Sequence, residues 1–370
     1  MKIIKRVSIL PILVLISFLL VSCDMKDEEM SESKTYSNVY YTIKYPSNWR
    51  EPELIAPKVF FLKDDNKCSL DIKALPYKDS IEDLIPKDES EECIIDGNKG
   101  YKVKIEENNE IITFYLIQKN DMLFEMMFKS QVDDYKNCLA SMDQMIKSFE
   151  FNDFESMSFA NWNQFTIENI EVYYPNNSVI NDTIEEWGKD RVEAFNYITE
   201  YLDVQWEYEP IKMYVFDSEE HGEQYGLQLG FALPGYNHIF TLHNQYPGHE
   251  LAHCVSYYIN NGERIDSALI NEGLATHLNM TGKDYHRMTA DILQEKSYTI
   301  KLLGDDFRKN EDAYTFGASF VKYLIDKYSL ELFKEFFAQN QYNEEESFRE
   351  FYDKEGNVLV NEWMDYLKTY

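Results

Sequence analysis

The first part of the chain alternates apolar and polar residues at the two-residue period of β-strands. The clearest run is Tyr40–Pro46, which Pro46 stops. Asn108-Asn109 and Asn120-Asp121 separate later runs and are typical of hairpin turns. Those later strand-like runs are Lys58–Leu62, Ser69–Ala74, Gly100–Glu106, Glu110–Ile117 and Met122–Lys129. The pattern predicts an antiparallel sheet.

A helical stripe closes this first region. Apolar residues are then spaced three or four positions apart, which is the spacing of one helix face. They are Val132, Tyr135, Leu139, Met142, Ile146 and Phe149. Such a helix would cover one face of the sheet. We therefore predict one α/β domain over residues 36–151, followed by a linker over 152–160.

The second region mixes strands with helices. Phe165–Tyr174, Ile211–Phe216 and the end of Gly235–His243 have the pattern of strands, and Ile184–Leu202 has that of an amphipathic helix. From Pro247 onward the pattern is almost entirely helical. We predict a second domain over 161–370, a small sheet with a mostly helical lobe, and an α+β fold class for the whole chain.

The N-terminus has the order of a secretory signal. Three cationic residues precede an apolar run of about 15 residues, shorter than the ~20 residues of a membrane span. The run ends in Leu20-Val21-Ser22-Cys23, which resembles a bacterial lipobox. That resemblance implies a lipoprotein signal over residues 1–23, with cleavage before Cys23 and a lipid on the Cys23 thiol. It also implies a polar tether over 24–35 and anchoring on the outer face of the bacterial cell membrane. An ordinary signal peptide or an uncleaved anchor is the alternative.

Composition narrows the class of protein. The length of 370 residues suggests about two domains, and 44% hydrophobic residues suffice for a sizeable core. Asp and Glu outnumber Lys and Arg by 66 to 36, for a net charge of −30, which argues against a nucleic-acid partner. Cys68, Cys93 and Cys138 allow one disulfide among them, although apolar filling is an equal alternative.

The residues suited to catalysis or metal binding lie mainly in the second region, which holds all seven His residues. His249-Glu250-Leu251-Ala252-His253 is an HExxH motif. On a helix, positions i and i+4 share a face, so two imidazoles can bind one zinc ion while Glu250 lies beside it as a general base. A buried pair of structural His residues is the alternative.

A second segment contains Glu272, which lies 19 residues after His253. Asn271-Glu272-Gly273-Leu274-Ala275 ("NEGLA") together with HExxH resembles the gluzincin metallopeptidases, and 161–370 resembles the peptidase-MA-like domain in particular. The resemblance implies one Zn²⁺ per chain held by His249, His253 and Glu272, with Glu250 as base. Asp266 or Ser267 can cap the helix of Glu272, and Gly273 and Ala275 would let that helix pack closely on the zinc helix.

The resemblance also implies two supporting groups. One donates a hydrogen bond to the oxyanion that forms during the reaction, and the other accepts a hydrogen bond from the second ring nitrogen of a ligand His. Tyr314, in a "Y…SFVxYL" segment, is the best positional match for the donor; His277 and His286 are weaker candidates. The Asp that thermolysin-type enzymes use to hold a ligand His is replaced by Thr276. We expect a backbone carbonyl or another carboxylate in its place. His243 is expected as a wall residue, on a strand at the edge of the cleft, and Cys254 in the core.

The first domain also resembles a known family. Its opening "YTIKYPSNW" and closing "MIKSFEF" are similar to PsbP-like domains, an α/β sandwich that implies no catalytic residue.

Together the patterns predict a lipid-anchored extracellular zinc peptidase that hydrolyses peptide bonds with a zinc-bound water activated by Glu250. No motif for binding a free substrate amine precedes His249, which favours an endopeptidase acting on peptides or proteins. The alternative is a non-catalytic surface binding or adhesion lipoprotein that uses a gluzincin scaffold. The intact Glu250 favours the enzyme.

Overall fold

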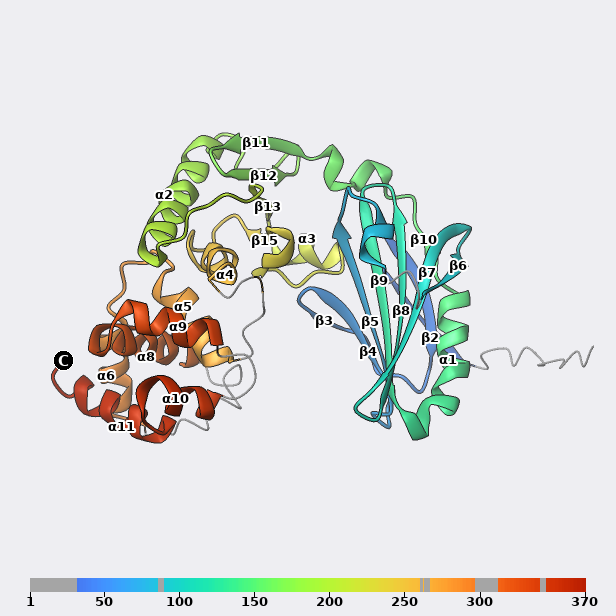
Figure 1. Cartoon of the computed structure of the whole chain (residues 1–370). Coiled ribbons are helices and arrows are strands. Elements are labelled where there is room, and N and C mark those ends of the chain that lie inside the picture. Colours follow the sequence, from blue (N-terminus) through green and yellow to red (C-terminus); the bar gives the residue numbers. More distant parts are fainter. Residues whose placement is uncertain (1–31, 86–89, 260–261, 263–266, 297–311, 340–343) are drawn as a thin grey trace, which may run out of the picture.

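A computed structural model describes residues 32–370 except 86–89, 260–261, 263–266, 297–311 and 340–343 (Figure 1). The predicted signal, Cys23 and most of the predicted tether lie outside the described residues. The structure is a mixed α+β fold with sheets in its first part and helices gathered at its C-terminal end, as predicted. Among the described residues, no helix combines the length and the apolar composition that crossing a membrane requires.

The N-terminal part is an antiparallel sheet of seven strands in the order β3-β4-β5-β9-β8-β7-β6, with a smaller sheet β1-β2-β10. Its elements are β1 Ser33–Ser37, β2 Tyr41–Pro46, β3 Glu53–Ile55, β4 Lys58–Leu62, β5 Cys68–Pro76, β6 Ser90–Ile95, β7 Asn98–Glu107, β8 Glu110–Lys119, β9 Met122–Gln131, α1 Tyr135–Lys147 and β10 Glu150–Phe151. Asn108, Asn109 and Asn120 have positive φ, which confirms both predicted hairpin turns.

Helix α1 packs on this sheet system as predicted, but its buried face is shifted from the predicted stripe, of which only Met142 is fully buried within the helix. It contacts β2 and β9 and buries Cys138, Met142 and Met145 in the core that also contains Phe124. A disulfide joins Cys68 of β5 to Cys138 of α1, which fixes the pair that the sequence left open; Cys93 is free.

The C-terminal part is a five-stranded sheet in the order β11-β12-β13-β15-β14. Its longer helices pack on one face, whereas the short helix α3 (Glu219–Gln224) lies on the other face, toward the N-terminal part. Its elements are β11 Asn163–Ile167, β12 Ile170–Tyr174, α2 Ile184–Leu202, β13 Ile211–Phe216, α3 Glu219–Gln224, β14 Phe231–Leu233, β15 His238–Leu242, α4 His249–Tyr257, α5 Ala268–His277, α6 Tyr285–Leu293, α8 Ala313–Lys327, α9 Leu330–Gln339, α10 Glu344–Tyr352 and α11 Gly356–Leu367. Strands β12, β13 and β15 are parallel, and β11 and β14 run antiparallel to them at the two edges.

The two faces of this sheet belong to different cores, because alternate residues of a strand point to opposite faces. Ile170, Val172 and Met213 pack with the helices. Tyr173, Tyr214 and other aromatic residues pack with the core of the N-terminal sheet. The C-terminal sheet is thus covered on both sides, by the helices and by the N-terminal part.

Three predicted boundaries differ from the structure. The linker predicted over 152–160 contains Phe154 and Phe159, both buried in the shared aromatic core, so it is packed structure. The tether predicted over 24–35 ends earlier, since β1 begins at Ser33. The single strand predicted over Phe165–Tyr174 is a hairpin, because Glu168 adopts a positive φ and reverses the chain.

Candidate metal centre

The predicted zinc helix exists and begins at its first ligand. α4 starts at His249, directly after Gly248. A Cβ at Gly248 would lie 2.4 Å from the carbonyl oxygen of Leu278, so only glycine lets α4 begin this close to the end of α5. Helix α5 is capped by the side chain of Ser267, which accepts a hydrogen bond from the Ile270 amide. Asp266, the alternative cap, lies outside the described residues.

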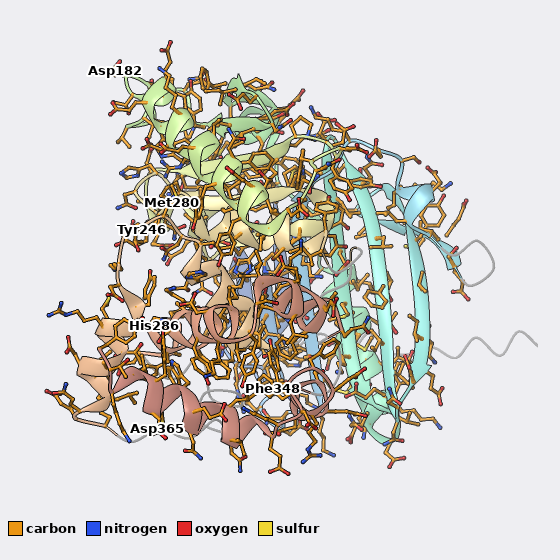
Figure 2. The ribbon with its side chains drawn as sticks, turned by 60° about the vertical axis from the view of Figure 1, so that its left-hand side comes forward. Asp182, Tyr246, Met280, His286, Phe348 and Asp365 are labelled. Atoms are coloured by element: carbon orange, nitrogen blue, oxygen red, sulfur yellow. A yellow bond between two sulfur atoms is a disulfide. The ribbon has the colours of Figure 1, made fainter. Side chains whose placement is uncertain are left out.

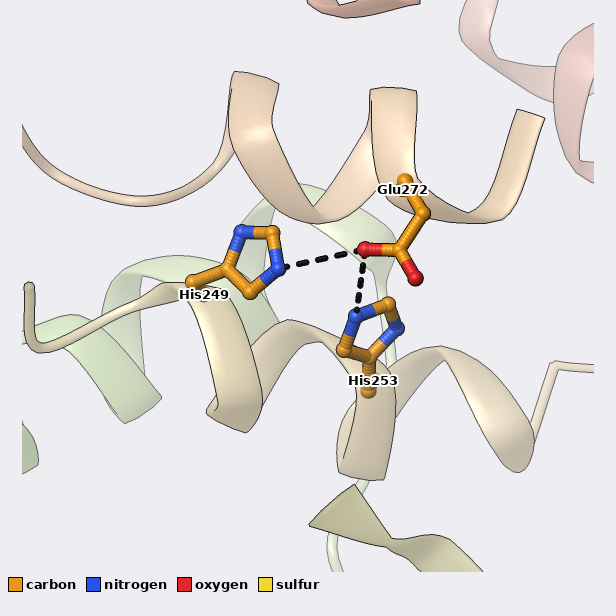
Figure 3. Close-up of side chains that lie close together, drawn as sticks. All are labelled: His249, His253 and Glu272. Carbon is orange, nitrogen blue, oxygen red and sulfur yellow. Dashed lines mark ion pairs between the residues drawn. The ribbon is translucent and has the colours of Figure 1, made fainter. Parts of the chain in front are cut away.

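The three predicted ligands converge, two from α4 and one from α5 (Figure 3). The Nε2 atoms of His249 and His253 lie 3.3 Å and 3.4 Å from the same oxygen, Oε2 of Glu272. The three ligand atoms all lie within 4.8 Å of one another, and they form a group that could hold a metal ion.

This spacing fits zinc. Two ligand atoms that each lie about 2.0–2.1 Å from one tetrahedral ion are roughly 3.3 Å apart. The separations between the imidazole nitrogens and the Glu272 oxygen match that value, and the donor set of two nitrogens and one carboxylate is the one that catalytic zinc sites use. The site therefore fits the ion without rearrangement of these contacts.

The ligands also control one another's protonation. Burial alone would raise the pKa of Glu272, but the hydrogen bonds to the two imidazoles hold it well below its usual value. Burial alone would lower the pKa of His253, but the hydrogen bond to Glu272 raises it. Glu272 is thus ionised, which is the form that binds a cation.

The outer partner of His253 differs from our expectation. Nδ1 of His253 lies 3.2 Å from Oδ1 of Asn271, so the partner is a side-chain amide rather than a backbone carbonyl or a carboxylate. An Nδ1–H donating to that oxygen leaves Nε2 free to face Glu272. Thr276, at the thermolysin-type Asp position, is buried, and its Oγ1 has no hydrogen-bond partner among the described residues. Sequence reasoning missed Asn271, although it stands next to the ligand Glu272.

Glu250 lies beside the ligands on the first turn of α4. Its side chain is 9% exposed, and burial raises the pKa of its carboxyl, while the neighbouring His249 and His253 counteract that rise. A carboxylate whose proton affinity is raised is a better general base.

Tyr314 approaches the same cluster from a third helix. It lies in the first turn of α8, is 41% exposed, and its ring centroid is 6.1 Å from that of His249. The structure thus brings Tyr314 to the predicted site, whereas its catalytic role stays a prediction.

The other candidate His residues lie elsewhere in the helical lobe. His277 contacts the Tyr201 hydroxyl through Nε2 at 3.2 Å. His286, labelled in Figure 2, is fully buried, and its Nδ1 lies 2.9 Å from the Ser319 hydroxyl. Both are used in packing. Cys254 is buried in the core, as expected.

The strand at the sheet edge differs from the one predicted. β15, which precedes His243, lies inside the sheet between β13 and β14. The edge strand beside α4 is β14, which the sequence analysis did not identify. The Nε1–H group of Trp187 donates to the backbone oxygen of His243, which ties the chain after β15 to α2.

No family model and no curated protein matches the chain. Several solved structures are similar to it. The solution structure of cyanobacterial PsbP from Synechocystis sp. PCC 6803 is 13% identical, with a TM-score of 0.28, covering 32% of this chain and 92% of that one. A crystal structure from Bacteroides thetaiotaomicron is 13% identical, with a TM-score of 0.28, covering 68% and 78%.

Aminopeptidase A of Legionella pneumophila, crystallised with aspartic acid, is 14% identical, with a TM-score of 0.36. That match covers 80% of this chain and 47% of the aminopeptidase. All three TM-scores lie below 0.5, so the function proposed below depends on the site's own residues.

Proposed function

We propose that this chain is a zinc metallopeptidase of the gluzincin type that hydrolyses peptide bonds. One observation carries the proposal: the two imidazoles of HExxH meet a single oxygen of Glu272 at 3.3 and 3.4 Å, with Glu250 buried beside them. A zinc ion bound there would lower the pKa of water and polarise a carbonyl group.

The chain's own residues supply the other parts of the reaction. The carboxylate of Glu250 accepts the proton of the attacking water and can later donate it to the leaving amine. The hydroxyl of Tyr314 donates a hydrogen bond to the carbonyl oxygen as negative charge develops on it. Asn271 holds the ring of His253 in the orientation that directs Nε2 into the site.

Edge strand β14 suits an extended substrate. It is paired with β15 on one side only, and it contacts α4. A peptide that adds to its free edge by backbone hydrogen bonds would lie beside the zinc helix. Because such pairing needs no free terminus, we propose an endopeptidase.

We further propose that the protein acts outside the cell, anchored by a lipid on Cys23. The apolar run ending in Leu20-Val21-Ser22-Cys23 supports this location. So does the Cys68–Cys138 disulfide, because disulfides persist in oxidising compartments. A Cys23→Ala chain should lose its membrane association; unchanged retention in the membrane fraction would refute the anchor.

The decisive experiment combines metal analysis with a peptide-library digest. Wild-type protein should contain one zinc per chain, and His249→Ala/His253→Ala protein should contain none. Glu250→Gln keeps the shape and the ligands but removes the base, so activity should fall by about 10²–10⁴ with zinc retained. Glu193→Gln, an exposed position of α2, is the matched control.

The outcomes separate the two functions that the sequence allows. Zinc that survives loss of both His residues would refute the assigned site. Zinc bound as expected, with no peptide cleaved by wild-type protein, would identify a binding scaffold instead of an enzyme. Cleavage that persists unchanged in Glu250→Gln would refute the proposed mechanism.

A further inference from the structure

A cavity of about 850 Å³ lies on the face of the C-terminal sheet opposite α4. Its walls come from both parts of the chain: Tyr77 and Asp121 from the N-terminal part, and Tyr208, Tyr236 and Tyr258 from the C-terminal part. The volume falls within the roughly 300–1,000 Å³ of small-molecule sites. The zinc cluster is not among the residues that line the cavity, so the cavity is a separate site.

Three polar groups on the floor of the cavity lack a protein partner. Lys212 of β13 pairs in register with His238 of β15, and Tyr214 follows two residues later on the same face. Within the described part of the chain, no hydrogen bond is formed by the Tyr214 hydroxyl, by the Lys212 ammonium or by either ring nitrogen of His238. Tyr214 and His238 are only 4% and 6% exposed.

Buried hydrogen-bonding groups are normally paired. Nδ1 of His238 is fully buried without a partner, and the Tyr214 hydroxyl and the Lys212 ammonium beside it form no hydrogen bond among the described residues, so the cavity is suited to a ligand with hydroxyl or amide groups. Burial, and to a lesser extent Lys212, lowers the pKa of His238 to about 3, so its ring is neutral and can donate through one nitrogen and accept through the other.

The distribution of charge disfavours strongly charged ligands. Among the exposed charges at the cavity, four carboxylates outnumber one ammonium, that of Lys78. The cavity is also lined by exposed carboxylates, those of Asp79, Asp121, Glu207 and Glu209. These would repel an anion on entry, and the whole chain is strongly acidic. The Lys212 ammonium on the floor would in turn repel a cation that entered fully.

The aromatic walls favour flat rings with apolar faces. Tyr208 and Tyr258 stack on each other, and Tyr173 stacks on Tyr214 with ring centroids 5.0 Å apart. The negative face of an aromatic ring attracts polarised C–H groups, such as those on the faces of sugar rings. Tyrosines also supply a hydroxyl at the ring edge.

From the size, the unpaired hydrogen-bonding groups of the floor and the tyrosine walls, we propose that this cavity binds a neutral saccharide of a few rings. The site lies between the two parts of the chain, so it would give the N-terminal part a role in ligand binding. It does not depend on the proposed peptidase activity.

Calorimetric titration of the full-length protein in detergent tests the proposal. The probes are chitotetraose, cellotetraose and maltotetraose, with tetragalacturonate and the tetramer of glucosamine as anionic and cationic counterparts. At least one neutral tetrasaccharide should bind with a millimolar or lower Kd, and the charged tetramers should bind about tenfold more weakly or not at all.

Two tyrosines of the cavity wall are exposed, so they can be substituted without disturbing the hydrophobic core. Tyr208→Ala and Tyr236→Ala should each weaken binding by about tenfold, since each removes a ring contact. Tyr197→Ala, equally exposed but on α2 and outside the cavity, should bind as wild type does. Circular dichroism checks that each variant is folded.

Three results would overturn the inference. The first is that folded wild-type protein binds none of the three neutral tetrasaccharides at millimolar concentration. The second is that both wall variants bind as tightly as wild type. The third is a preference for the cationic tetramer, which would identify the cavity as a site for cationic groups such as those of basic peptides.

Discussion

Tyr314 lies in the first turn of α8 with its ring 6.1 Å from that of His249. Tyr314→Phe removes only the hydroxyl, which would act once charge develops on the substrate oxygen. We expect kcat to fall by about 10²–10³ with KM little changed. Steady-state kinetics on one cleaved peptide measure this, with Tyr197→Phe as a control of similar exposure. A kcat within a few-fold of wild type would assign Tyr314 to packing.

Asn271 is the residue that directs His253 into the site. Asn271→Ala removes the acceptor for Nδ1–H, so zinc affinity should fall by about 10–100-fold. Asn271→Asp keeps an acceptor and should restore most of the affinity. Competition with a chelator measures both. If the Asp variant binds zinc as weakly as the Ala variant, the hydrogen bond does not orient the ligand.

His238 makes stability depend on pH. Its folded pKa of about 3 lies below the usual 6.5, so between these values the unfolded chain binds more protons than the folded one. The free energy of unfolding should therefore decrease as pH falls below about 6.5, by about 1.4 kcal/mol per pH unit from this residue. Urea denaturation should show a shallower pH dependence for His238→Gln than for wild type; equal slopes would contradict this.

Helix α5, which carries Glu272, is positioned mainly by α8. A Cβ at Gly273 would lie 2.7 Å from backbone atoms of Gly317, so α5 and α8 approach each other through two glycines. The sequence analysis assigned this close contact to the zinc helix, and that assignment was wrong. The position of Glu272 therefore depends on a helix that begins about 40 residues later in the chain.

Gly273→Ala tests this contact. The added methyl group meets backbone that cannot move aside, so the variant should lose about 1–3 kcal/mol of unfolding free energy. Gly188→Ala in α2 is the matched control, because its added methyl group meets only side-chain atoms of Phe165 and Ile167. The control should lose less unfolding free energy than Gly273→Ala. Equal denaturation midpoints for the two variants would mean that the helices can separate without cost.

Helices and strands whose apolar residues recur at a regular spacing could be predicted from the sequence. The amphipathic helix at 184–202 and the strand at 211–216 have the predicted bounds. β6 was missed because it is an edge strand whose residues are mostly exposed and lack alternation. β14, only three residues long, gave no period to detect.

The grouping of His249, His253 and Glu272 could be predicted because two of them share one helix face and the third stands in a specific motif. Their surroundings could not. Which side chain reaches Nδ1 of His253 depends on the packing of α4 against α5, and no local pattern encodes that packing. The cavity opposite α4 likewise exists only because two distant parts of the chain meet.

At the scale of the whole molecule, one aromatic cluster joins the N-terminal part to the C-terminal sheet. Phe159 is at its centre, with Tyr225 stacked on it and Tyr214 4.8 Å away, centroid to centroid. Because the cluster is continuous, we expect the two parts of the wild-type protein to unfold together.

Phe159→Ala should cost about 3–5 kcal/mol and separate the unfolding of the two parts. Hydrogen exchange, compared between β7–β9 and α9–α11 under mild denaturant, measures this. Phe337→Ala, in the core of the helices, is the control. It should lower the free energy of unfolding without creating a difference in exchange between β7–β9 and α9–α11. A variant at Phe159 that still exchanges uniformly would show that the two parts are coupled by other contacts.

The helices that carry the three candidate ligands are held by a core of their own. Leu251, Val255, Leu269 and Leu274 of α4 and α5 are fully or almost fully buried in it, independently of the ligand cluster. A chelating agent should therefore act on this protein as a reversible inhibitor and not as a denaturant. The stripped protein should keep its melting temperature within a few degrees and regain activity when zinc, or spectroscopically visible cobalt, is returned.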